Sequence, residues 1–165
     1  MEGGAEYGIA RRLAERAETL VVVETSAGGL VSAQLTLIPG SSTWFIGGVV
    51  AYSSAARQLW LDVPEETTRR VGAVSAEAAL ALARAGRDQL GASWGAAETG
   101  IAGPQAGRRS AKPVGLAYVA VVGTAQGQAV ERVVEVVTGL GEREANREAF
   151  ATALLHLLLE MVSHP

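Results

Sequence analysis

The spacing of apolar residues predicts alternating helices and strands along most of the chain. Apolar residues from Ile9 to Ala17 recur at helical intervals, so residues 5–18 are expected to form an amphipathic helix with its charges outward. The following segment, 19–25 (TLVVVET), is a nearly unbroken run rich in β-branched residues. Such a run is typical of a strand that is covered on both faces, as in a parallel sheet between two layers of helices.

The remainder of the chain repeats this alternation of elements. The pattern predicts four further strands, at 44–53, 92–99, 114–124 and 128–138. It predicts four further helices, at 30–38, 54–63, 73–91 and 142–162. Ser75 is the expected N-cap of the third of these helices. Only residues 125–127 separate the last two strands, which indicates a hairpin, and the segment 103–113 has the glycine, proline and charge content of an exposed loop.

This order of elements predicts an α/β fold, a three-layer α/β/α sandwich with a mixed sheet of about five strands. No repeat, linker or low-complexity tract divides residues 1–165, so a single domain is expected. Open α/β sheets bind ligands at loops beyond the carboxyl ends of their strands. The segments 25–29, 52–57 and 99–104 are therefore expected to border one pocket.

The composition excludes several kinds of site. Apolar residues make up 48% of the chain and charged residues 19%, as in a globular protein. There is no cysteine, which excludes disulfides and thiol nucleophiles. The two histidines, His156 and His164, are too few for a histidine-rich metal site, and both are expected to be surface residues. We therefore expect no metal site.

The charge and the hydropathy of the chain argue against two kinds of partner, nucleic acids and membranes. The formal net charge is −3, and no run of lysine and arginine with interleaved aromatic residues occurs, so direct nucleic-acid binding is not expected. No apolar stretch approaches the roughly 20 residues that span a bilayer, and the first residues do not resemble a signal peptide. A soluble cytoplasmic protein without a membrane partner is expected.

Two small-residue loops follow predicted strands. SAGG at 26–29 places backbone N–H groups at a helix N-terminus, which favours an anionic ligand, although such a turn also serves as a packing device. TGIAGP at 99–104 is either a ligand-binding loop or a tight loop whose glycines adopt positive φ. Two such loops on neighbouring strands are better explained by one ligand site than by two coincidences.

The charged and aromatic candidates have competing interpretations. Tyr52 is either a pocket residue or a strand-edge tyrosine, and Arg57 is either a pocket cation or a solvated helix arginine. The segment 142–147 (EREANR) is either a charged helix start or a source of an arginine, Arg143 or Arg147, for a phosphate.

Six short motifs follow one another along the chain in an order that is typical of a known family. These are ETSAGG at 24–29, the run from PGSS at 39–42 to AYS at 51–53, GAVS at 72–75, TGIAGP at 99–104, KPVG at 112–115 and REANR at 143–147. In this order and spacing, they resemble the C-terminal domain of CinA, a family that includes nicotinamide mononucleotide amidohydrolases. The resemblance covers residues 7–160.

The resemblance implies a fold, a reaction and an assembly. It implies an α/β/α domain that hydrolyses the carboxamide of nicotinamide mononucleotide to nicotinate mononucleotide and ammonia, without a metal or other cofactor. It also implies a homo-oligomer. In longer members the domain follows an N-terminal domain similar to molybdopterin-biosynthesis proteins, which we expect to be absent here.

Carried onto this chain, the family's catalytic pattern is altered at two positions. The family's chemistry resembles an amidase in which a serine attacks, a lysine takes its proton and a tyrosine assists. Thr25 stands at the serine position and Arg57 at the lysine position, while Tyr52 keeps the tyrosine. An arginine cannot act as a base near neutral pH, and the threonine methyl crowds the attack, so impaired catalysis is expected. Ser26 is a possible replacement nucleophile, but the sequence offers it no base.

The predicted binding residues are better preserved than the catalytic ones. They are Ser26, Gly28, Gly29, Thr99, Gly100, Ala102, Gly103, Arg143 and Arg147. Together they would hold nicotinamide mononucleotide or a similar nucleotide. The alternative is a catalytically silent nucleotide-binding or partner-binding protein in a competence or DNA-damage setting, and chemistry at positions 25 and 57 distinguishes the two.

Overall fold

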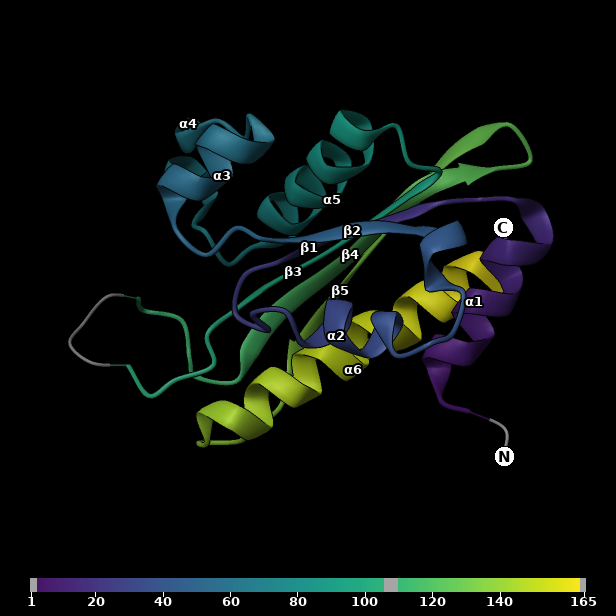
Figure 1. Ribbon diagram of the computed structural model, residues 1–165. Coiled ribbons are helices and arrows are strands. Elements are labelled where there is room, and N and C mark those ends of the chain that lie inside the picture. The colour runs from purple at the N-terminus through teal and green to yellow at the C-terminus, as the bar shows by residue number, and fades with distance from the viewer. Residues whose placement is uncertain (1–2, 106–109, 164–165) are drawn as a thin grey trace.

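The sheet has five strands and is mixed (Figure 1). The computed structural model describes residues 3–105 and 110–163. The strands are β1 (Leu20–Glu24), β2 (Phe45–Val50), β3 (Trp94–Gly100), β4 (Leu116–Ala125) and β5 (Gln128–Val137). Their order is β2-β1-β3-β4-β5, with β2, β1 and β3 parallel and β4 and β5 antiparallel. The predicted mixed sheet of about five strands is confirmed.

Helices cover both faces of this sheet, which confirms the three-layer prediction (Figure 1). One face carries α1 (Ala5–Arg16), α2 (Leu30–Thr36) and α6 (Arg143–Ser163). The other face carries α3 (Ser54–Leu61), α4 (Glu65–Val71) and α5 (Ala76–Leu90). A 3₁₀ turn, η1 (Ser41–Thr43), precedes β2.

The two larger hydrophobic clusters of the described residues lie on opposite faces of the sheet, because side chains alternate along the central strands. On β1, Val22 packs with the residues of α1, α2 and α6, whereas Val23 packs with those of α5. Helix α5 approaches the sheet closely at Gly95, where a Cβ atom would lie 2.1 Å from the carbonyl oxygen of Ala83. Close helix-on-sheet packing therefore depends on small residues.

The sequence missed one helix and misplaced several boundaries. Helix α4 was not predicted, because none of its residues is buried and it has no apolar face. Strand β2 ends at Val50 rather than at residue 53, since the chain turns there toward α3. The predicted cap of α5 is confirmed, because the Ser75 hydroxyl accepts a hydrogen bond of 3.1 Å from the Ala78 N–H.

The structure also bears on the histidines, on membrane-spanning helices and on metal-binding groups. His156 is exposed, as predicted, whereas His164 and residues 106–109 of the predicted loop lie outside the described residues. Across residues 3–105 and 110–163, no helix is long and apolar enough to cross a membrane. The same part of the chain contains no group of three acidic or histidine side chains that could hold a metal ion.

Candidate functional site

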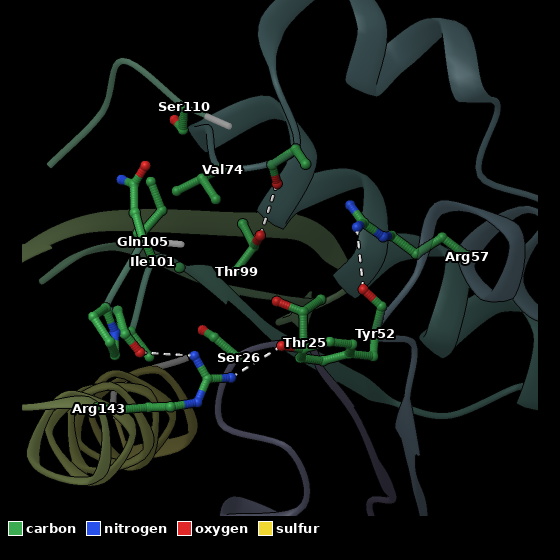
Figure 2. A pocket seen from close by; sticks show the side chains of 15 residues that line it. Thr25, Ser26, Tyr52, Arg57, Val74, Thr99, Ile101, Gln105, Ser110 and Arg143 are labelled. Carbon is green, nitrogen blue, oxygen red and sulfur yellow. Dashed lines mark hydrogen bonds between the residues drawn. The ribbon is translucent and has the colours of Figure 1, made fainter. Parts of the chain in front are cut away.

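A pocket of about 430 Å³ opens at the carboxyl ends of β1, β2 and β3 (Figure 2). All three loops that the sequence assigned to one pocket border it. The predicted site residues that line it are Thr25, Ser26, Tyr52, Arg57, Thr99, Gly100, Ala102, Gly103 and Arg143. Gly28, Gly29 and Arg147, also predicted to contact a ligand, are not among its lining residues.

A buried carboxylate organises the turn after β1. Glu98, on β3, is fully buried, and its Oε1 accepts hydrogen bonds from the backbone N–H groups of Thr25 (2.6 Å) and Ala27 (2.7 Å). Its Oε2 accepts a hydrogen bond of 2.6 Å from the Ser26 hydroxyl. The Ser26 side chain lines the pocket, so Glu98 lies directly behind a pocket hydroxyl.

Burial determines the ionisation of Glu98. Loss of hydration raises the pKa of Glu98 above its ordinary value, and the nearby Glu24 raises it further. The hydrogen bonds from Ser26, Ala27 and Thr25 act in the opposite direction, and burial outweighs them. Glu98 therefore holds a proton more readily in the folded protein than in the unfolded chain.

This shift predicts how Glu98→Gln changes stability with pH. A raised folded-state pKa gives stability that is fully present below the ordinary carboxyl pKa of about 4.3 and is lost as pH rises through the folded-state value. We therefore expect the free energy of unfolding of the wild type, minus that of Glu98→Gln, to fall as pH increases. Urea unfolding of both proteins between about pH 4 and pH 8 measures this difference. A difference that stays constant or rises contradicts the assignment.

A second buried carboxylate occupies the N-terminus of α2. Glu24 is fully buried and accepts hydrogen bonds from the backbone N–H groups of Gly29 (2.8 Å), Val31 (3.1 Å) and Ser32 (2.9 Å). The Ser32 hydroxyl also donates to it at 2.6 Å. The helix N-terminus expected to favour an anionic ligand thus already holds an anion from the protein itself. The amides at the start of α2 therefore serve packing within the protein, which was the alternative interpretation of SAGG.

Arg57 is a buried cation with an unused donor. Its side chain lines the pocket although only 8% of the residue is exposed. Nε donates to the Ser53 carbonyl at 3.3 Å and Nη2 to the Tyr52 carbonyl at 3.4 Å (Figure 2). Nη1 has no hydrogen-bond partner within the described part of the chain. Burial lowers the pKa of Arg57, as expected for a cation that has no ion-pair partner among residues 3–105 and 110–163.

Arg143 connects the loops on the opposite side of the pocket. Its Nη1 donates to the Gly103 carbonyl at 2.9 Å, and its Nη2 donates to the Tyr52 hydroxyl at 3.0 Å. Figure 2 shows Arg143 and Arg57 on different sides of Thr25 and Ser26. The pocket therefore has a positive charge on each side of its two hydroxyl groups.

The rest of the EREANR segment supports the loops from behind. Arg147 donates to the backbone carbonyls of Ser26 (3.2 Å) and Ala27 (2.9 Å). Asn146 is fully buried, and its amide donates to the Ala102 carbonyl at 3.0 Å. Of the two arginines that the sequence offered to a phosphate, Arg143 lines the pocket, while Arg147 fixes the turn after β1.

The TGIAGP loop forms the wall facing Ser26. The Thr99 hydroxyl donates to the Ala73 carbonyl at 2.7 Å and ties β3 to the start of α5. A Cβ atom on Gly100 would lie 2.9 Å from the Ser26 Oγ, so a side chain there would crowd that hydroxyl. Gly103 has φ +75, a conformation that favours glycine.

Three polar residues of the site, Glu98, Glu24 and Asn146, could not be singled out from their sequence motifs. Each is a fully buried polar residue that satisfies backbone groups of a pocket loop or of the adjoining helix. For the two glutamates a signal was available, since an acidic residue at the end of an otherwise apolar strand needs a partner. The sequence also offered Ser26 no base, whereas the structure places a carboxylate against it.

The fold is an α/β domain with a pocket at the carboxyl ends of its parallel strands, where open α/β sheets bind their ligands. The family model of the CinA C-terminal domain matches residues 4–162. The chain belongs to the CinA C-terminal domain family.

Relatives and solved structures agree with this assignment. A CinA-like protein of Synechococcus sp. (strain RCC307) is 49% identical over 115 residues, which cover 70% of this chain and 27% of that protein. A CinA-like protein of Anaeromyxobacter sp. (strain K) is 41% identical over 150 residues, covering 91% of this chain and 35% of that protein. This chain therefore spans about a quarter to a third of the length of these relatives.

Two crystal structures share the fold over nearly their whole length. Competence damage-inducible protein A from Klebsiella pneumoniae has a TM-score of 0.85 at 26% identity, covering 97% of this chain and 96% of that chain. Competence/damage inducible protein CihA from Agrobacterium tumefaciens has a TM-score of 0.82 at 32% identity, covering 98% of each chain.

Proposed function

We propose that this chain binds nicotinamide mononucleotide, or a similar nucleotide, in the pocket at the ends of β1, β2 and β3, and hydrolyses its carboxamide slowly. The observation that carries the proposal is the buried, unpaired Nη1 of Arg57 beside the hydroxyl groups of Thr25 and Ser26. The reaction is the one that the resemblance to nicotinamide mononucleotide amidohydrolases implies. It needs no metal or other cofactor.

The charge arrangement supports an anionic ligand. A buried cation without a counter-ion is costly, and an anionic group on a ligand offsets that cost. The planar guanidinium of Arg57 suits the oxygens of a phosphate or carboxylate group. Arg143 adds a second positive charge across the pocket, while the nearby Glu24 and Glu98 are both buried and hydrogen-bonded to backbone amides.

Slow turnover follows from the same residues. The guanidinium of Arg57 stays protonated near neutral pH and cannot accept the proton of an attacking hydroxyl. The Thr25 methyl group restricts its side-chain rotamers and crowds an approaching amide carbon. Binding depends little on a general base, so it survives these two changes better than catalysis does.

Calorimetry tests the binding part of the proposal. We expect the wild type to bind nicotinamide mononucleotide and Arg57→Met to bind it roughly ten to a hundred times more weakly, because a charge-assisted hydrogen bond is lost. Arg11→Met, on the exposed surface of α1, is the matched control and should bind like the wild type. Absence of wild-type binding rules out this nucleotide, and equal binding by Arg57→Met rules out the role given to Arg57.

The second candidate is a catalytically silent nucleotide-binding or partner-binding protein in a competence or DNA-damage setting. The same two residues, Thr25 and Arg57, favour it, because neither matches the catalytic pattern that the resemblance implies. Ammonia release from nicotinamide mononucleotide distinguishes the candidates. Binding without any ammonia release above the uncatalysed rate supports the silent protein.

We also propose a homo-oligomer. Helix α3 exposes Leu59 (79%) and Trp60 (54%), two large apolar side chains in sequence on one short helix. A second copy of the chain would remove them from water. Sedimentation of the wild type beside Trp60→Ser tests this, and a monomeric wild type contradicts it.

A further inference from the structure

We propose that the amide hydrolysis proposed above uses Ser26 as its nucleophile and Glu98 as the general base, in place of Thr25 and Arg57. The contact that carries this inference is the hydrogen bond of 2.6 Å from the Ser26 Oγ to the Glu98 Oε2. The inference rests on the proposed function for its substrate. The activated serine itself can be tested without that substrate.

The two side chains lie on opposite sides of the pocket wall. Ser26 lines the pocket, whereas Glu98 is fully buried behind it. The hydrogen bond between them meets the first requirement for an activated serine, a base within hydrogen-bond reach of the attacking hydroxyl. Among the residues that the structure describes, no group forms a hydrogen bond with the Thr25 hydroxyl. Of the two adjacent hydroxyl groups, only that of Ser26 has a base.

The surroundings hold this pair in a fixed geometry. The N–H groups of Thr25 and Ala27 bind Oε1 of Glu98, which directs Oε2 toward Ser26. Arg147 holds the carbonyls of Ser26 and Ala27 from α6. Gly100 leaves the Ser26 Oγ uncrowded, since a Cβ atom there would lie 2.9 Å from it. Preorganisation of this kind favours a catalytic contact.

The protonation of Glu98 suits a base that works near neutral pH. Burial and the neighbouring Glu24 on β1 raise the pKa of Glu98 above its ordinary value, which makes its carboxylate a stronger base than an ordinary one. Arg147 also lies near this turn, and its guanidinium is held by the backbone carbonyls of Ser26 and Ala27. Arg57 and Arg143 line the pocket on the far side of Ser26.

The reaction balances with these groups alone. The Ser26 Oγ attacks the carboxamide carbon while its proton passes to Glu98. The tetrahedral intermediate collapses as the C–N bond breaks, and Glu98 returns the proton to the departing nitrogen, which leaves as ammonia. Water then attacks the Ser26 ester, with Glu98 accepting a proton from the water. Glu98 returns it to the Ser26 Oγ as the acid product leaves.

A purely structural role for Glu98 is the alternative. In that case Glu98 would only brace the turn through the amides of Thr25 and Ala27. Glu98→Gln separates the two roles, because a glutamine carbonyl oxygen still accepts those hydrogen bonds but the side chain cannot take up the Ser26 proton. A structural role predicts a serine of unchanged reactivity in this variant.

Labelling with a fluorophosphonate probe tests the inference on the whole chain. The Ser26 Oγ would form a bond to phosphorus, fluoride would leave, and the proton would pass to Glu98. Mass spectrometry of the labelled peptide should place the adduct on Ser26 and not on Thr25. We expect Ser26→Ala to abolish labelling and Glu98→Gln to slow it by roughly a hundredfold or more.

The chain supplies its own matched control serine. Ser32 donates to Glu24 at 2.6 Å, a similar contact, but Ser32 does not line this pocket. Ser32 should stay unlabelled, and Ser32→Ala should be labelled at the wild-type rate. An adduct on Thr25, equal labelling of Ser32 and Ser26, or no labelling of the wild type overturns the inference. So does wild-type reactivity in a Glu98→Gln protein whose circular dichroism is unchanged.

Ammonia release separates this inference from the proposed function. If the probe labels Ser26 but nicotinamide mononucleotide releases no ammonia, the activated serine stands and the proposed substrate fails. If ammonia is released at the same rate by Ser26→Ala, the proposed function stands and the nucleophile assignment fails. In the wild type the labelling rate should rise with pH through one ionisation above the ordinary glutamate range, a profile that a bracing carboxylate would not produce.

Discussion

Replacing Trp94 with alanine is expected to lower the free energy of unfolding by about 3–5 kcal/mol. Trp94 begins β3 and is fully buried in the core between the sheet and α1, α2 and α6. Its ring lies against Gly123 on β4, where a Cβ atom would be 2.2 Å from the ring. The indole N–H also donates to Glu18 at 2.8 Å. The substitution therefore leaves a large cavity and an unpaired acceptor.

Trp60 provides the matched control for this prediction. It has the same side chain but lies on α3 with 54% of its surface exposed. In protein dilute enough for the proposed homo-oligomer to dissociate, Trp60→Ala should change the free energy of unfolding by roughly 0.5 kcal/mol or less, as surface substitutions usually do. Urea unfolding followed by far-ultraviolet circular dichroism compares the variants without relying on tryptophan emission. A loss below about 1 kcal/mol for Trp94→Ala would contradict the packing described here.

The fold could be predicted because its signals are local. The β-branched run of β1 and the small-residue helix α5 each identify their own structure, and their alternation defines the layers. Helix α4 was missed because it buries no residue and so has no hydrophobic period to detect. Its acidic first turn and basic last turn were the available signals.

The pocket could be predicted only in outline, since its chemistry depends on contacts between distant segments. The three loops were identified from the ends of their strands. The Ser26–Glu98 contact joins residues 72 positions apart, and it requires the register that pairs Val23 of β1 with Ala97 of β3. No local pattern reveals that register, so Ser26 was assigned no base.

The helix N-terminus at SAGG was likewise predicted only in outline. The sequence correctly indicates a turn followed by a helix, and such amides attract negative charge. The sequence does not indicate which acidic group, from a ligand or from the protein itself, binds these amides. Glu24 lies only five residues before Gly29. The chain folds back between them, so that the Glu24 carboxylate accepts the hydrogen bond of the Gly29 amide. The anion binding that we propose for this pocket therefore depends on the arginine side chains.

Restoring the family pattern with Thr25→Ser and Arg57→Lys together is expected to raise ammonia release from nicotinamide mononucleotide by about 10²–10⁴-fold. The reason is that the pair adds a base that lines the pocket, whereas Glu98 is fully buried behind Ser26. Both positions line the pocket, and a lysine, unlike arginine, can lose its proton near neutral pH when buried. Each single change should give much less than the pair, because a nucleophile and its base act as a unit.

The wild type sets the reference for this experiment. Wild-type turnover within the range of ordinary enzymes, about 1–10³ per second, would contradict the expectation that these two residues impair catalysis. Adding Ser26→Ala to the wild type and to the double variant then shows which nucleophile each of them uses. It should abolish ammonia release from the wild type, where Ser26 is the proposed nucleophile. In the double variant most of the release should persist, since the restored serine and lysine then provide a second nucleophile and a base independent of Glu98.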